Sequence, residues 1–150
     1  MIAIVVAMTI FGLNKKTFKF TATNYEIIGH SIDTVRVNLT SHKFSLFITT
    51  VDIDEKIRIA RQLESTNGRI SNSILFFDKK ESALKYSKTW KITYELTVDL
   101  KASYFSNNKF HKETFCYGND TLTVNEYGIV SGWTKCTSVS ELGKKKDLNK

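Results

Sequence analysis

The chain of 150 residues has no proline and contains only two cysteines and three histidines. Cys116 and Cys136 are too few and too far apart in the sequence to form a zinc knuckle. Both lie in expected strands of one C-terminal meander, so they are candidate neighbours in space. We expect two half-buried thiols, and a bond between them is the alternative that the sequence leaves open.

Arginine is scarce, because only four of the 22 basic side chains are arginines and lysine supplies the other 18. The guanidinium of arginine can bind a guanine edge or a phosphate through two hydrogen bonds at once, whereas the ammonium of lysine acts as a hydrated point charge. The predominance of lysine over arginine argues against a protein dedicated to sequence-specific DNA recognition. The abundance of Lys, Asn and Ile, together with the missing proline, is typical of an AT-rich coding sequence, as in a phage, a virus, a mobile element or a low-GC bacterium.

Long apolar runs are also missing. Residues 1–13 form an apolar stretch that is shorter than the ~20 residues needed to cross a bilayer. The stretch lacks the basic start and the small-residue cleavage site of a signal peptide. We predict a buried first strand there and a protein of the cytoplasm of the producing or infected cell. The alternative is a processed or anchoring segment on a secreted protein.

Catalytic signatures are absent from the sequence. No serine lies in a nucleophile elbow, no glycine-rich phosphate loop follows a strand, and no two of the histidines His30, His42 and His111 have ligand spacing. A Cys116 nucleophile assisted by His111 is disfavoured, because a spacing of five places the two on opposite faces of one strand. We therefore expect a protein that is not an enzyme and that needs no cofactor.

What the chain does have is a globular composition with a surplus of positive charge. It is 41% hydrophobic and 12% aromatic, which argues against disorder. Its formal net charge is +7. The last seven residues carry four basic groups and one acidic group, so the body of the chain is only mildly basic. We predict one domain over residues 1–143 and a basic tail over 144–150.

The clearest strand pattern covers residues 90–101. Trp90 and the even positions after it are apolar, whereas Lys91 and the odd positions are polar. Successive side chains of a strand point to opposite faces, so this alternation predicts a long strand with one dry face. We expect this strand to be central to its sheet, with helices covering its apolar side.

Two helices are predicted, at about 53–66 and 79–88. Asp52 with Glu55, and Asp78 with Glu81, have the spacing of N-terminal caps. Further strands are expected along the chain, and the last three form a C-terminal meander: 17–22, 25–28, 33–40, 43–51, 70–77, 114–117, 121–124 and 129–137. The predicted fold is therefore α+β, a single domain with a mostly antiparallel sheet. A parallel arrangement of the strands at 43–51, 70–77 and 90–101 is the alternative.

Under the parallel arrangement, three carboxylates meet at one edge of the sheet. Asp52, Asp78 and Asp99 each follow or end a strand, and oxygen ligands at such an edge suit Mg²⁺. Helix capping accounts equally for Asp52 and Asp78, and a solvent-facing strand position accounts for Asp99. We favour these structural roles over a metal site.

The pair Asp99 and Lys101 is a second candidate, because metal-dependent nucleases often carry an acidic residue and a lysine two positions apart on a strand. Such a site needs a further carboxylate, for which Glu95 or Asp78 would serve. Cross-strand ion pairs are the simpler explanation of these charges.

Basic side chains gather around the two predicted helices. Arg58 and Arg61 lie on the first helix with Arg69 just after it, and Lys85 and Lys88 lie on the second. Aromatic residues nearby would let a base stack, although a solvated helix face explains the same charges. The leading hypothesis is a small binding protein that docks on a macromolecular partner, nucleic acid or protein, with a polyanion favoured. The alternatives are a metal-dependent phosphodiesterase using Asp99 and Lys101, and a structural or virion subunit.

Overall fold

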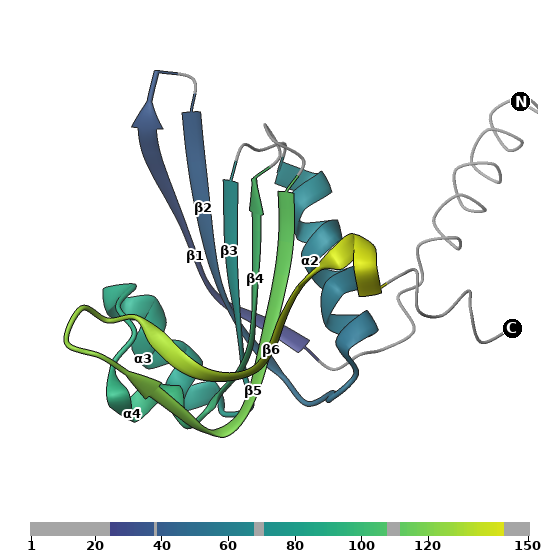
Figure 1. Ribbon diagram of the computed structural model, residues 1–150. Coiled ribbons are helices and arrows are strands. Elements are labelled where there is room, and N and C mark those ends of the chain that lie inside the picture. Colours follow the sequence, from purple (N-terminus) through teal and green to yellow (C-terminus); the bar gives the residue numbers. More distant parts are fainter. Residues whose placement is uncertain (1–24, 38, 68–70, 108–111, 143–150) are drawn as a thin grey trace, which may run out of the picture.

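A computed structural model describes residues 25–37, 39–67, 71–107 and 112–142 of the chain. The predicted strands at 1–13 and 17–22, the basic tail, Arg69 and His111 lie outside these ranges. The described part forms one six-stranded sheet whose spatial order follows the sequence (Figure 1). Its strands are β1 (Tyr25–Arg36), β2 (Leu39–Ile48), β3 (Ser71–Phe77), β4 (Leu100–Asn107), β5 (Lys112–Val124) and β6 (Val130–Ser138).

One pair of neighbours in this sheet is parallel and the rest are antiparallel. β2 and β3 run parallel and are joined by the helix α2 (Ile53–Asn67), whereas all other neighbouring strands run antiparallel. A second helix, α3 (Lys80–Thr89), follows β3. The predicted α+β fold with a mostly antiparallel sheet and two main helices is confirmed, and so is the C-terminal meander, which β4, β5 and β6 form.

The two main helices cover opposite faces of the sheet. Ile74 and Phe76 of β3 pack with Ala60 of α2, while Leu75 and Phe77 of the same strand pack with α3 and the short helix α4 (Tyr94–Thr97). This division follows from the alternation of side chains along a strand. The continuous apolar run in β3 is thus explained by burial on both sides, and we refer to the two sides as the α2 face and the α3 face.

The predicted strand at 90–101 is wrong. Trp90 has a left-handed backbone conformation (φ 53°) that ends α3, and the chain then forms α4 before β4 begins at Leu100. The alternating pattern misleads because its even positions contain the series Ile92, Leu96 and Leu100. That series also has the i, i+4 spacing that a helix face would show, and of the three only Leu96 lies in α4. These three side chains pack into the core of the α3 face, whereas Tyr94 is 68% exposed.

The predicted strands leave gaps at residues 41–42 and 118–120, where turns are expected, and the structure has no turn at either place. The turn expected at Ser41 and His42 lies inside β2, and the hairpin between β1 and β2 reverses before Leu39 instead. The turn expected at residues 118–120 is a register shift within the single strand β5. Ser41 and His42 thus lie in a regularly paired part of β2, whereas Gly118 marks a strand irregularity and not a chain reversal.

Gly29 of β1 allows α3 to lie directly against the sheet. A Cβ atom at this position would lie 2.4 Å from Cβ of Ser87 and 3.2 Å from the ring of Trp90. Real Cβ atoms do not approach one another so closely, so a side chain here would push α3 away. The gap between the predicted strands at 25–28 and 33–40 is therefore not a turn: Gly29 lies inside β1 and marks a close approach of helix and strand.

Cys116 and Cys136 form a disulfide between β5 and β6, which corrects the expectation of two thiols. The two residues stand opposite each other in the register of the strands. A row across the sheet continues from them through Ser103 of β4 to Leu75 of β3. The disulfide thus fastens the edge strand β6 to the rest of the sheet.

Candidate anion-binding pocket

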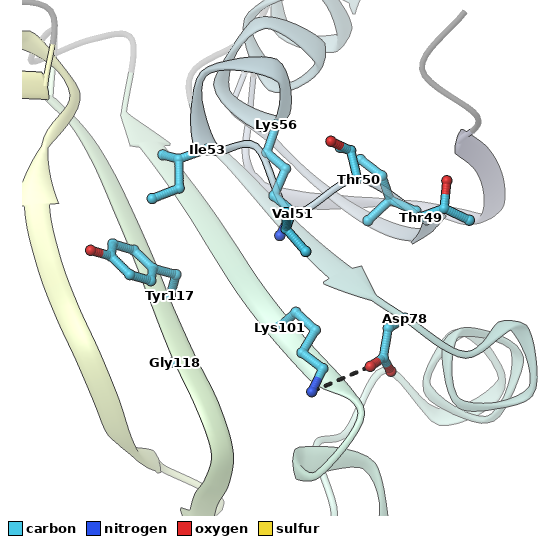
Figure 2. A pocket seen from close by; sticks show the side chains of 10 residues that line it. Thr49, Thr50, Val51, Ile53, Lys56, Asp78, Lys101, Tyr117 and Gly118 are labelled. Carbon is cyan, nitrogen blue, oxygen red and sulfur yellow. Dashed lines mark ion pairs between the residues drawn. The ribbon is translucent and has the colours of Figure 1, made fainter.

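A pocket of about 410 Å³ opens at the edge of the sheet where β2 and β3 end and β4 begins (Figure 2). Its walls come from four parts of the chain that are distant in sequence: residues 48–56 from the end of β2 to the first turn of α2, the segment just after β3, the start of β4, and the middle of β5. The lining residues are Ile48, Thr49, Thr50, Val51, Ile53, Lys56, Asp78, Lys101, Tyr117 and Gly118.

Lys56 is the most unusual side chain of this pocket, because it is a lysine with only 5% of its surface exposed. It lies on the side of α2 that carries the core residues Ile57 and Ala60. No ion pair or hydrogen bond joins its ammonium to another residue in the part of the chain that the structure describes. Loss of hydration through burial lowers the pKa of Lys56; Lys101 lowers it further, and Asp78 partly opposes the shift.

Lys101 reaches the pocket because β4 is irregular at this point. Ala102 stands opposite Phe76 and Leu100 stands opposite Phe77, so Lys101 is an extra residue in the pairing with β3. Leu100 then faces α3 and Ala102 faces α2, although regular alternation would put them on one face. Bulges of this kind re-aim side chains at the ends of sheets. Here the bulge directs Lys101 toward Asp78, whose carboxylate lies 3.3 Å from the ammonium.

Two crossed ion pairs join the end of β3 to the start of β4 beside the pocket. Asp78 pairs with Lys101, and Lys79 pairs with Asp99 at 2.7 Å. The backbone N–H of Asp78 also donates to the carbonyl of Asp99, and the hydroxyl of Ser82 donates to the Asp99 carboxylate. Desolvation raises the pKa of Asp99, but the hydrogen bonds from Lys79 and Ser82 outweigh it and leave this pKa below the usual range.

The three carboxylates proposed for Mg²⁺ therefore have separate roles. Asp52 caps α2, since its side chain accepts a hydrogen bond of 3.0 Å from the backbone N–H of Asp54. The capping role predicted for Asp78 is wrong, because Lys79 precedes α3 and makes no side-chain cap, and Asp78 pairs with Lys101 instead. Asp99 is buried, not solvent-facing. Within the described ranges, no three His, Cys, Asp or Glu side chains form a group able to hold a metal.

The residues proposed for phosphodiester cleavage are likewise separated in the structure. Asp99 lies in the turn before β4, so it is not on the same strand as Lys101. Glu95 lies on α4, where its exposed carboxylate is 3.9 Å from the ammonium of Lys85. The expectation that Asp99 and Lys101 make ion pairs with neighbours agrees with the structure.

The basic residues predicted to bind an anion lie on two opposite faces of the sheet. Arg58 and Arg61 are on α2 and pair with Glu55 and Glu113. Lys85 and Lys88 are on α3, and both are exposed. The structure thus does not bring the described members of this set together, and a shared anion-binding role for them stays a prediction.

Two further groupings were missed by the sequence interpretation. Lys56 falls three residues after Ile53, so the helical spacing of the buried side of α2 was the signal that would have found it. His30 and His42, which fall in two separate gaps between the predicted strands, lie on neighbouring strands with Nε2 of His30 2.8 Å from Nδ1 of His42. His30 also stacks on Phe44. Only the pairing of β1 with β2 reveals this contact.

Comparison with known proteins gives no relative: no family model, no curated protein and no solved structure matches the chain. Among the helices in the described ranges, none combines the length and the apolar character that crossing a bilayer demands. Any functional conclusion therefore depends on the chemistry of the pocket.

Proposed function

We propose that the chain is a small binding protein that docks on an anionic macromolecular partner, with nucleic acid the favoured class, and that the pocket holds one phosphate group of that partner. The observation that carries the proposal is Lys56, a buried lysine that lines a pocket of about 410 Å³. Buried ionisable groups with shifted pKa values in a cavity are typical of functional sites.

The chemistry of the pocket suits a phosphate. An ammonium removed from water without a counter-ion costs free energy, and a bound phosphate oxygen would offset that cost. Thr49 and Thr50 line the same pocket, where the Thr50 hydroxyl accepts a hydrogen bond from the backbone N–H of Asp52, and Lys101 supplies a second ammonium. Since Asp78 balances one of the two lysines, the pocket has a single positive charge in excess.

The phosphodiesterase alternative gains no comparable support. A metal-dependent site needs carboxylates that are available to the ion, whereas Asp78 and Asp99 each bind a lysine ammonium. The proposal therefore concerns binding and includes no chemical step.

The test is fluorescence anisotropy with labelled single- and double-stranded DNA and RNA, at low and near-physiological salt, with and without Mg²⁺. We expect binding that weakens steeply with salt. The variant Lys56→Met should weaken it about tenfold, as expected for a lost charged hydrogen bond. Lys112→Met is the matched control, because it removes the same charge from an exposed position at the start of β5 that is outside both the pocket and the predicted anion-binding set.

Equal losses in the two variants would show that only total charge matters and would refute a phosphate site at Lys56. Absence of binding at low salt would refute the nucleic-acid partner. A signal that decays only with Mg²⁺ would replace binding by cleavage as the function.

The disulfide supports the secreted alternative over the cytoplasmic prediction, because such bonds form and persist in oxidising compartments. We propose that the chain acts in such a compartment. Alkylation of the protein from its natural source under denaturing conditions measures this directly. Uptake of two alkyl groups without prior reduction would contradict it.

A further inference from the structure

A second cavity lies on the α3 face of the sheet, remote from the pocket of Lys56. Its volume is about 320 Å³, which lies within the range of small-molecule sites. It is walled by β3 and β4, by Tyr86 of α3, and by the hairpin between β5 and β6. The lining residues are Ser73, Leu75, Tyr86, Ile92, Leu100, Ser103, Phe105, Gly128, Ile129, Val130 and Trp133.

Ser103 is the one lining residue that is buried and polar and has an unpaired group. It is 1% exposed, and its hydroxyl has no hydrogen-bond partner among the residues that the structure describes. Its neighbours across the sheet, Leu75 and Cys116, offer no side-chain acceptor of oxygen or nitrogen. Two other buried serines, Ser45 beside α3 and Ser82 within it, have hydrogen-bond partners. The hydroxyl of Ser45 donates to the carbonyl of Ala83, and the hydroxyl of Ser82 donates to the Asp99 carboxylate.

An unpaired buried hydroxyl needs an explanation, because leaving a polar group without a partner costs about 1–3 kcal/mol. Ser103 lines a cavity whose walls are otherwise mostly apolar. A bound molecule with one hydrogen-bonding group would satisfy the serine and fill the apolar space at the same time.

The remaining walls favour a flat, apolar molecule. Three aromatic side chains line the cavity: Tyr86, Phe105 and Trp133. Tyr86 is uncharged at physiological pH, as tyrosine normally is, and burial raises its pKa further, to about 12, so it offers no charge to a ligand. Aromatic rings pack against one another in offset and edge-to-face arrangements that such a cavity accommodates.

The cavity also has an apolar entrance that solvent reaches. Ile129 of the hairpin is 61% exposed, and Phe105 of β4 is 43% exposed. Large apolar side chains grouped at the rim of a cavity are typical of ligand-binding grooves. The neighbouring Gly128 has φ of 75°, which holds the hairpin in a turn that presents Ile129 at this rim.

We propose that this cavity binds a small aromatic molecule that carries one hydrogen-bonding group, and that Ser103 is the residue that recognises this group. The inference is independent of the phosphate pocket, because the two sites share no lining residue.

The test compares 2-naphthol with naphthalene, two probes of the same ring system that differ by one hydroxyl. Titrations of the whole chain are followed by amide and indole chemical shifts in NMR. We expect both probes to shift Ile129, Val130 and Trp133, and 2-naphthol to bind about fivefold more tightly, as one neutral hydrogen bond predicts.

The variant Ser103→Ala should abolish the advantage of 2-naphthol and leave the affinity for naphthalene unchanged. It should not lower the melting temperature, since it removes a group that has no partner in the free protein. Ser106→Ala is the matched control, because Ser106 is buried on the same strand but bonds to Asn72 on the α2 face. Ile129→Gln at the rim should weaken both probes.

The proposal is overturned if neither probe shifts the hairpin residues, or if Ser103→Ala weakens the two probes equally. It is also overturned if Ser106→Ala removes the preference for 2-naphthol as fully as Ser103→Ala does.

Discussion

The carboxylate of Glu64 accepts a hydrogen bond of 2.8 Å from the hydroxyl of Tyr104, and both side chains are buried between α2 and the sheet. The second oxygen of Glu64 is buried and has no hydrogen-bond partner within the described ranges of the chain. Burial, followed by the bond to Glu64, raises the pKa of Tyr104 well above its usual value. A buried carboxylate thus depends on a single phenol for its hydrogen bonding.

Tyr104→Phe should therefore destabilise the protein by about 1–3 kcal/mol, because it leaves the Glu64 carboxylate buried with no bond to that hydroxyl. Urea unfolding of the variant and the parent measures the loss. The double variant Glu64→Met with Tyr104→Phe should recover most of it, since no buried charge remains. Tyr127→Phe, at a position that is 79% exposed, is the control and should change little. Equal stability of parent and Tyr104→Phe would contradict this account.

Reduction of the disulfide should lower the stability by about 3 kcal/mol, because the bond closes a loop between residues 20 apart in the sequence and restricts the unfolded chain. The double variant Cys116→Ala with Cys136→Ala should show the same loss with and without a reducing agent. Chemical unfolding in both conditions measures the effect. A parent protein that unfolds identically when reduced would argue against this contribution.

Gly29→Ala should destabilise the protein by roughly 1–3 kcal/mol, because the added methyl group overlaps Ser87 of α3. Removing the opposing Cβ in the double variant Gly29→Ala with Ser87→Gly should restore part of the loss beyond what Ser87→Gly alone predicts. Thermal unfolding of the four proteins gives the coupling between the two positions. Additive effects would show that helix and strand do not contact through these positions.

The helices and the core strand β3 were predictable because their signals are local. Asp52 caps α2, and the apolar run of β3 fits a strand buried on both faces. The stretch after Trp90 was not predictable in this way, since its apolar positions satisfy both the strand and the helix spacing. The tertiary contacts of Leu96 in α4, and of Leu100 at the start of β4, decide where the short helix ends and the strand begins.

The disulfide and the pocket depend on irregularities that no local pattern reports. Val124 pairs with Val130, and this register continued without interruption would place Ser138 opposite Cys116. The shift within β5 brings Cys136 there instead. In the same way, the bulge at Lys101 joins it to the pocket of Lys56. A sequence read element by element cannot supply such offsets between strands.

Lys56→Met should stabilise the protein at pH 7 by about 1 kcal/mol and raise its melting temperature by about 3 °C, because it replaces a buried charge with an apolar side chain of similar length. Folding lowers the pKa of Lys56, so the unfolded chain binds its proton more strongly than the folded one. Between the lowered pKa and the ordinary value of 10.5, the unfolded state thus holds more protons, and the contribution of Lys56 to stability rises with pH. The advantage of Lys56→Met over the parent should accordingly shrink as the pH increases through that window.

Thermal unfolding of both proteins from pH 7 to pH 10 measures this difference, and Lys88→Met provides the control at an exposed lysine of α3. Inorganic phosphate should stabilise the parent at pH 7 and leave Lys56→Met unchanged, because a bound anion removes the cost of the buried ammonium only where that ammonium exists. An advantage of Lys56→Met that stays constant with pH would mean that its origin is packing and not charge. Equal stabilisation of both proteins by phosphate would place the anion elsewhere on the surface.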